Sequence, residues 1–183
     1  MNSIVLEVDL DKIRRNTARI VEGCHAQGIA VLGVTKGFTA IHQIVTVIGS
    51  QRDEAGDEQR IELITAGRHY QRNGIDYITY DESKLTGLEG TTTMLKLYDD
   101  YVVLVRLGHI EQRQEFRKGE RNSCMYVTPY GTMEMSVATS DVTMAFAKGN
   151  GRITIAYELE IEGRWQSSNK LAITIREEKT NGH

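Results

Sequence analysis

The chain has 183 residues, of which 40% are hydrophobic and 26% are charged, and this balance is typical of a folded globular protein. Against a prior of about 100 to 200 residues per domain, the length predicts one domain of ordinary size with an extension. A net charge of -3 at pH 7 excludes a strongly basic protein, so we expect no nucleic-acid partner. No run approaches the ~20 apolar residues that span a bilayer, and the N-terminus lacks the basic start of a signal peptide. We therefore predict a cytoplasmic protein without a membrane partner.

Cysteine and histidine spacing argues against a metal site. Cys24 and Cys124 are 100 positions apart and belong to no CxxC or Cys/His cluster, which predicts reduced thiols rather than zinc ligands or a disulfide framework. The five histidines are scattered without the spacing of ligands. We also identify no catalytic residue from these patterns.

Residues 1–41 alternate between strand and helix patterns. The apolar run 4–8 predicts a strand, apolar residues at helical spacing after Asp11 predict a helix, and the continuous apolar run 29–34 is typical of a strand buried in a parallel sheet. These patterns together predict a short βαβ-type extension.

From residue 42 onward, apolar and polar residues alternate with a period of two. The Asn73–Gly74 pair predicts a tight hairpin turn, because both residues tolerate positive φ. Strands are expected near 45–47, 61–66, 68–71, 75–80, 91–97, 102–107, 114–118, 125–128, 132–139, 152–162 and 171–175. We predict a mainly β fold, an antiparallel barrel of about 8–10 strands that closes in an up-and-down order.

Several segments resemble the YwiB-like family. The matches are the run from Tyr80 to Thr93, the segment Val103–Gly108, the turn Thr128–Gly131 and the strand Asn169–Ile175, and they occur in the family's order. The resemblance implies a calycin, or lipocalin-like, barrel over residues 42–178, with a tail at 179–183. It implies no reaction, because the family's function is unassigned.

The first 41 residues resemble a different family. Glu7–Asn16 followed by Val31–Gly37 is similar to the opening of the alanine-racemase-type domain that binds pyridoxal phosphate (PLP), and Lys36 matches the lysine that carries the cofactor. That family's fold is a TIM-type barrel of about 250 residues, of which only the first strand is present. The cofactor's phosphate and ring partners come from strands that this chain does not encode. We therefore expect no cofactor, and PLP only if this fragment is functional.

A candidate ligand site follows from polar residues that alternate into the predicted barrel. The ligand-binding candidates are Tyr80, Glu82, Thr91, Thr93 and Arg106. An inward Arg106 would need Glu82 or Glu89 as a partner, because an unpaired buried charge costs several kcal/mol. Such a pair could orient an anionic group of a ligand, and the alternative is a structural polar network or a solvent-exposed face.

Three functions remain open at this stage. The first is a small-molecule binding module without catalysis, and the second is a remnant of a PLP-dependent racemase that uses Lys36. The third is a structural protein that forms a homodimer through barrel edges and the N-terminal fragment.

Overall fold

The structure, a computed structural model, describes residues 41–177. Residues 1–40, including Lys36 and the predicted βαβ-type extension, lie outside the described residues, as does the tail from 178 onward. The described segment forms ten antiparallel strands: β1 (Ile41–Asp53), β2 (Glu58–Arg72), β3 (Ile75–Asp81), β4 (Thr91–Leu97), β5 (Tyr101–Gly108), β6 (Gln112–Arg117), β7 (Arg121–Thr128), β8 (Gly131–Ala147), β9 (Asn150–Ile161) and β10 (Arg164–Glu177). One 3-10 turn, η1 (Lys84–Thr86), follows β3. The mainly β, antiparallel prediction is confirmed.

The strands follow one another around a barrel that is nearly closed. Every strand pairs with its neighbours in sequence except that β6 and β7 form no ladder, and β1 pairs with β10, so the first and last strands join. The order across the sheet runs from β6 through β1 and β10 to β7. The open place is therefore between β6 and β7, where a single bridge joins Glu111 to Val127 through backbone hydrogen bonds of 3.0 Å.

Local sequence signals explain several of the strand ends. Asn73 and Gly74 have φ of 53° and 79°, and they form the predicted turn between β2 and β3. The two strands expected at 61–66 and 68–71 are one strand, because Gly67 is not a break. A Cβ on Gly67 would lie 2.5 Å from the Val45 Cγ2 atom, so glycine permits a close approach of β2 to its neighbour.

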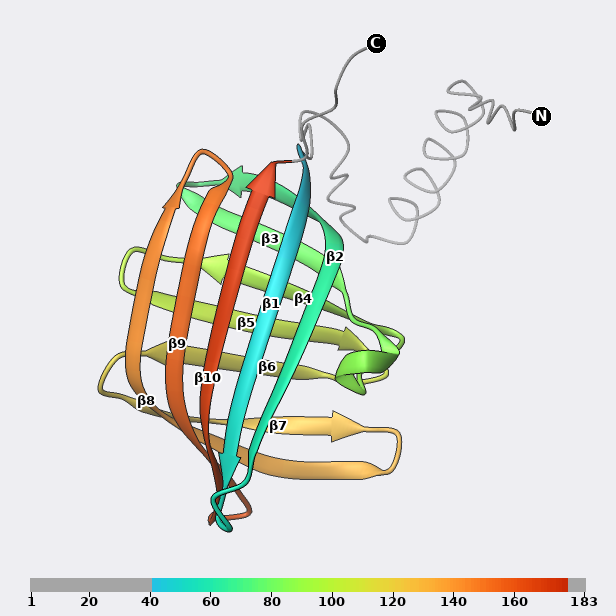
Figure 1. The fold of residues 1–183 in the computed structure, drawn as a ribbon, viewed down its shortest axis with the longest axis vertical. Coiled ribbons are helices and arrows are strands. Elements are labelled where there is room, and N and C mark those ends of the chain that lie inside the picture. The colour runs from blue at the N-terminus through green and yellow to red at the C-terminus, as the bar shows by residue number, and fades with distance from the viewer. Residues whose placement is uncertain (1–40, 178–183) are drawn as a thin grey trace, which may run out of the picture. The chain divides into compact units, whose positions relative to one another are not determined.

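The barrel has a front and a back wall (Figure 1). In that view β9, β10, β1 and β2 run lengthwise in front, while β4, β5, β6 and β7 cross behind them. The long β8 pairs first with β7 and then with β9, and its register shifts between Thr139 and Asp141. Such a bulge bends a strand, which allows β8 to pass from one wall to the other.

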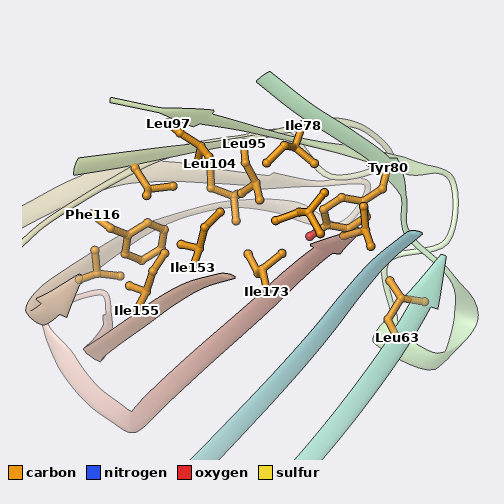
Figure 2. Close-up of a cluster of buried hydrophobic side chains, with 14 residues drawn as sticks. Leu63, Ile78, Tyr80, Leu95, Leu97, Leu104, Phe116, Ile153, Ile155 and Ile173 are labelled. Atoms are coloured by element: carbon orange, nitrogen blue, oxygen red, sulfur yellow. The ribbon is translucent and has the colours of Figure 1, made fainter. Parts of the chain in front are cut away.

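Aliphatic side chains fill the middle of the barrel. The most deeply buried come from both walls, as Figure 2 shows for Ile78, Leu95 and Leu104 of the back wall and Ile153 and Ile173 of the front wall. Each is the inward member of a period-two alternation, as the sequence predicts. Sites for chemistry are therefore to be sought at the two ends of the barrel.

Candidate functional site

A polar row crosses the inner face of the back wall. Tyr80 on β3 pairs with Thr93 on β4, Thr93 pairs with Arg106 on β5, and Arg106 pairs with Gln112 on β6. All four lie at inward positions of their strands, next to inward Ile78, Leu95 and Leu104. We call Tyr80, Thr93, Arg106 and Gln112 the back row.

Arg106 points inward and meets a buried carboxylate. Its Nε atom lies 3.9 Å from Glu82 Oε1, and the Glu82 side chain is only 3% exposed whereas that of Arg106 is 23% exposed. Thr93 Oγ1 donates a hydrogen bond of 2.6 Å to the same Glu82 oxygen. Of the two partners expected for Arg106, Glu82 is the one observed, since Glu89 lies outside and pairs with Lys84 at 3.7 Å.

Gln112 joins Arg106 to the gap between β6 and β7. Its Oε1 atom accepts a hydrogen bond of 3.0 Å from Arg106 Nη1, and its Nε2 atom lies 3.2 Å from Met135 Sδ and 3.7 Å from Cys124 Sγ. Cys124 in turn donates to Gln114 Oε1 at 3.1 Å. The back row thus continues across the gap as side-chain contacts.

A second polar row lies on the front wall. The cross-strand partners in order are Gln59, Gln51, Asn169, Tyr157 and Thr139, which we call the front row. A cavity of about 170 Å³ opens beside it, and inward-facing Gly49, Ile61 and Leu171 contribute to its walls. At about 30 Å³ for each water, this is room for a few waters or one small molecule.

Charge links the two rows. Burial raises the pKa of Tyr157, and the nearby positive charge of Arg106 opposes that rise. Burial also raises the pKa of Tyr80, reinforced by the charge of Glu82 and opposed by that of Arg106. Burial raises the pKa of the Cys124 thiol, while the hydrogen bond from Gln112 and the charge of Arg106 act to lower it. Since burial is the largest cause in each case, all three groups are uncharged at neutral pH.

The sequence candidates divide into two groups. Tyr80, Glu82, Thr93 and Arg106 are brought together, and their role in binding a ligand stays a prediction. Thr91 lies on the same buried face of β4 as Thr93, but its Oγ1 atom accepts a hydrogen bond of 3.2 Å from the Ile110 backbone nitrogen, so it holds the segment after β5.

Sequence reasoning missed the partners on other strands. Gln112, Tyr157 and Asn169 each lie at an inward position of an alternating strand, which is the signal that could have found them. A strand's alternation gives the face of a residue but not its neighbours, because neighbours depend on register.

A separate polar cluster lies at the other end of the barrel. His69 Nε2 is 2.6 Å from Asp76 Oδ1. His69 Nδ1 and both amide atoms of Gln43 are buried without a hydrogen-bond partner among the described residues. Gly149 covers them, since a Cβ there would lie 3.0 Å from His69 Nδ1. A Cβ at position 149 would also lie 3.1 Å from Gln43 Nε2, so glycine allows the turn to approach both polar groups.

Residues 41–177 contain neither a metal-binding cluster nor a membrane-spanning helix. No group of three or more histidine, cysteine or acidic side chains there is placed to hold a metal ion. No helix in that range has the length and apolar character needed to cross a membrane.

Comparisons with known proteins agree with the fold. One relative is described as an uncharacterized β-barrel protein, YwiB, of Bacillus subtilis (strain 168); it is 25% identical over 122 residues, covering 67% of this chain and 84% of the relative. The crystal structure of the ywiB protein from Bacillus subtilis matches with a TM-score of 0.69 at 23% identity, covering 78% of this chain and all of that one, and this likeness concerns the fold. Residues 1–41 lie outside the family match, so their resemblance to racemases stays a prediction. The description of the barrel as a calycin likewise stays a prediction. Because residues 45–173 match the family described as "Domain of unknown function (DUF1934)", the chain belongs to that family of YwiB-like β-barrel proteins.

Proposed function

We propose that the chain is a small-molecule binding module whose ligand occupies the mouth of the barrel between the front row and the back row. The observation that carries the proposal is the cavity of about 170 Å³ beside the front row, in a barrel whose middle is packed with aliphatic side chains. Ligand sites in small barrels lie at their mouths, where a few polar groups orient a ligand against apolar walls.

The lining has this mixed character. Leu171 and Ile61 offer apolar surface, while Gln51, Gln59 and Asn169 offer amide donors and acceptors. Asn169 is buried, and its Nδ2 atom donates to the hydroxyl and carbonyl oxygens of Ser167, which fixes its orientation. Fixed polar groups around a small space select a ligand by hydrogen bonding at low entropic cost.

Filling the cavity tests the proposal. Gly49 lines the cavity and a Cβ there would meet nothing within 4 Å, so we expect the side chain of Gly49→Leu to occupy the cavity. Thr46→Val, an outward-facing change on the same strand, is the control. We expect compounds from a collection of small polar molecules to raise the thermal midpoint of the wild type and the control but not of Gly49→Leu. Equal stabilisation of all three proteins, or stabilisation of none, would contradict the proposal.

The racemase-remnant hypothesis has its own test. If Lys36 binds the cofactor, adding pyridoxal phosphate to the full chain should produce a visible absorbance band, and Lys36→Ala should lose that band. No band, or the same band in both proteins, rejects that role.

A further inference from the structure

The outer face of the front wall carries mostly short, uncharged side chains at its centre. Val45, Leu63 and Ile173 are buried in the core, so their neighbours along each strand point outward. The register aligns two rows of outward residues across β2, β1, β10 and β9, and Ile44 pairs with Ala66 in a third row. One full row is Ile64, Thr46, Thr174 and Arg152, and the other is Glu62, Ile48, Ala172 and Thr154. We call these ten residues the outer patch, and in Figure 1 it lies on the side of the front wall turned toward the viewer.

The back wall covers its outward apolar residues, whereas the front wall does not. Val103 of β5 points outward, yet it is only 1% exposed, and its cross-strand neighbours are the long side chains of Lys96 and Glu115. On the front wall Ile64 is 66% exposed, and its neighbour on β1 is the short Thr46. Long charged side chains cover apolar surface with their stems, and the centre of the outer patch lacks them.

The shape of the outer patch favours a second sheet as its cover. Its side chains stand on neighbouring strands of one sheet, and Ile44 and Ile64 are the large apolar ones, 41% and 66% exposed. Two sheets pack face to face about 10 Å apart when short and branched side chains interdigitate. A second copy of the same chain supplies such a face with the same composition.

Charges of opposite sign flank the patch and support a twofold arrangement. Glu62 lies on the β2 side, 3.9 Å from exposed Arg60, whereas Arg152 on the β9 side has no ion-pair partner among residues 41–177. A twofold axis running along the strands between β1 and β10 places β2 of one copy over β9 of the other. Glu62 then lies one row, about 7 Å along the strand, from Arg152 of the partner subunit, a distance that an arginine side chain spans. Both flanks therefore attract.

The area of the patch indicates that these flanks take part. Four strands about 4.8 Å apart and three rows about 6.8 Å apart cover roughly 400 Å². A stable interface buries about 800 Å² on each partner. The uncharged centre alone is too small, so the charged residues around it must contribute to the contact.

We infer that the chain forms a twofold dimer with a second copy of itself by stacking the outer patches of two front walls, with Glu62 of each copy paired with Arg152 of the partner subunit. This interface is separate from the cavity beside the front row, which lies on the inner face of the same wall. The inference therefore holds whether or not the barrel binds a ligand.

Sedimentation equilibrium of the full chain tests the face. We expect the wild type to dimerise in the micromolar range and Ile64→Lys to weaken dimerisation about a hundredfold, because each copy then buries an unpaired charge. Leu107→Lys is the matched control and should leave the dimer unchanged, since Leu107 is an outward residue of the back wall with 55% exposure. A monomeric wild type, or equal association of the wild type and Ile64→Lys, would overturn the inference.

Exchanging the charges tests the pairing. Glu62→Arg and Arg152→Glu each bring like charges together, so each variant alone should dimerise at least tenfold more weakly than the wild type. An equal mixture of the two should recover wild-type association, because both contacts of the mixed dimer then join an arginine to a glutamate. Both positions are exposed, and circular dichroism confirms that each variant is folded. A mixture that associates no better than its components would overturn the pairing, and a patch covered by another segment of the same chain would give that result.

Discussion

Replacing Arg106 with an uncharged residue should destabilise the barrel, because the buried Glu82 carboxylate would lose its ion-pair partner. Two unit charges about 4 Å apart attract by about 4 kcal/mol at an effective dielectric constant of about 20, and the observed separation is 3.9 Å. Breaking a buried pair from one side costs about 3–5 kcal/mol, because the remaining charge is left buried. Arg106 retains some contact with water, so we expect the lower end, about 3 kcal/mol, for Arg106→Met.

The reverse change should cost less. In Glu82→Gln the amide oxygen still accepts the Thr93 hydroxyl, and the partly exposed guanidinium keeps its bond to Gln112. We expect about 1–2 kcal/mol for this variant. The double variant should lose less stability than the sum of the single losses, by about 2 kcal/mol, because neither charge then remains unpaired.

Urea unfolding at pH 7 of the wild type, both single variants and the double variant gives this coupling energy directly. Arg113→Met, which removes an exposed arginine from the outer face of β6, is the control and should change stability by less than about 0.5 kcal/mol. If the single losses add to within about 0.5 kcal/mol, the pair contributes nothing and the reasoning is wrong.

Three further measurements follow from the described residues. Gly67→Ala should lower the free energy of unfolding in urea by about 2 kcal/mol, because the new Cβ would lie 2.5 Å from Val45 Cγ2. The control Gly49→Ala, whose Cβ would meet nothing within 4 Å, should be neutral. Similar values for both variants would refute the steric argument. In a chain whose other cysteine is serine, Cys124 should be alkylated more slowly at about pH 8 in the folded than in the urea-unfolded state, because burial raises its pKa; equal rates would contradict this. The pKa of Tyr80 is raised in the folded chain, so its contribution to stability is full below about pH 10 and falls as pH rises further. Tyr80→Phe should therefore lose less stability than the wild type between about pH 9 and 11, and parallel losses would argue against a buried Tyr80 hydroxyl.

The fold could be predicted because its signals are local. Period-two alternation identified the faces of the strands, and the bounds predicted for β4, residues 91–97, coincide with those observed. Turn chemistry at Asn73 and Gly74 located the first hairpin after β1. Gly67 misled the prediction because glycine both ends strands and permits close packing within them, and only the position of Val45 tells which applies.

The candidate site could be predicted only in part, because it is assembled across strands. Tyr80, Thr93 and Arg106 belong to consecutive antiparallel strands, so they were expected on neighbouring strands, although the segment 82–90 between β3 and β4 hides the register of the first pair. Tyr157 and Asn169 come from the opposite wall, and no local pattern says that this wall faces Arg106. The choice of Glu82 over Glu89 was likewise left open, since it depends on how the segment around η1 lies after β3.

The position of the polar site has a physical cause in the incomplete closure of the barrel. A strand with neighbours on both sides satisfies its backbone groups within the sheet, and its inward side chains can all be aliphatic. Between β6 and β7, side chains supply part of this bonding: Gln114 Nε2 donates to the Asn122 carbonyl at 3.2 Å, and Gln112 contacts Cys124. Glutamines that bridge a gap in the wall must lie at inward positions, and this places Gln112 within 3.0 Å of Arg106. A complete β6–β7 ladder would remove the need for inward glutamines, so the partner that orients the guanidinium is present because the barrel does not close there.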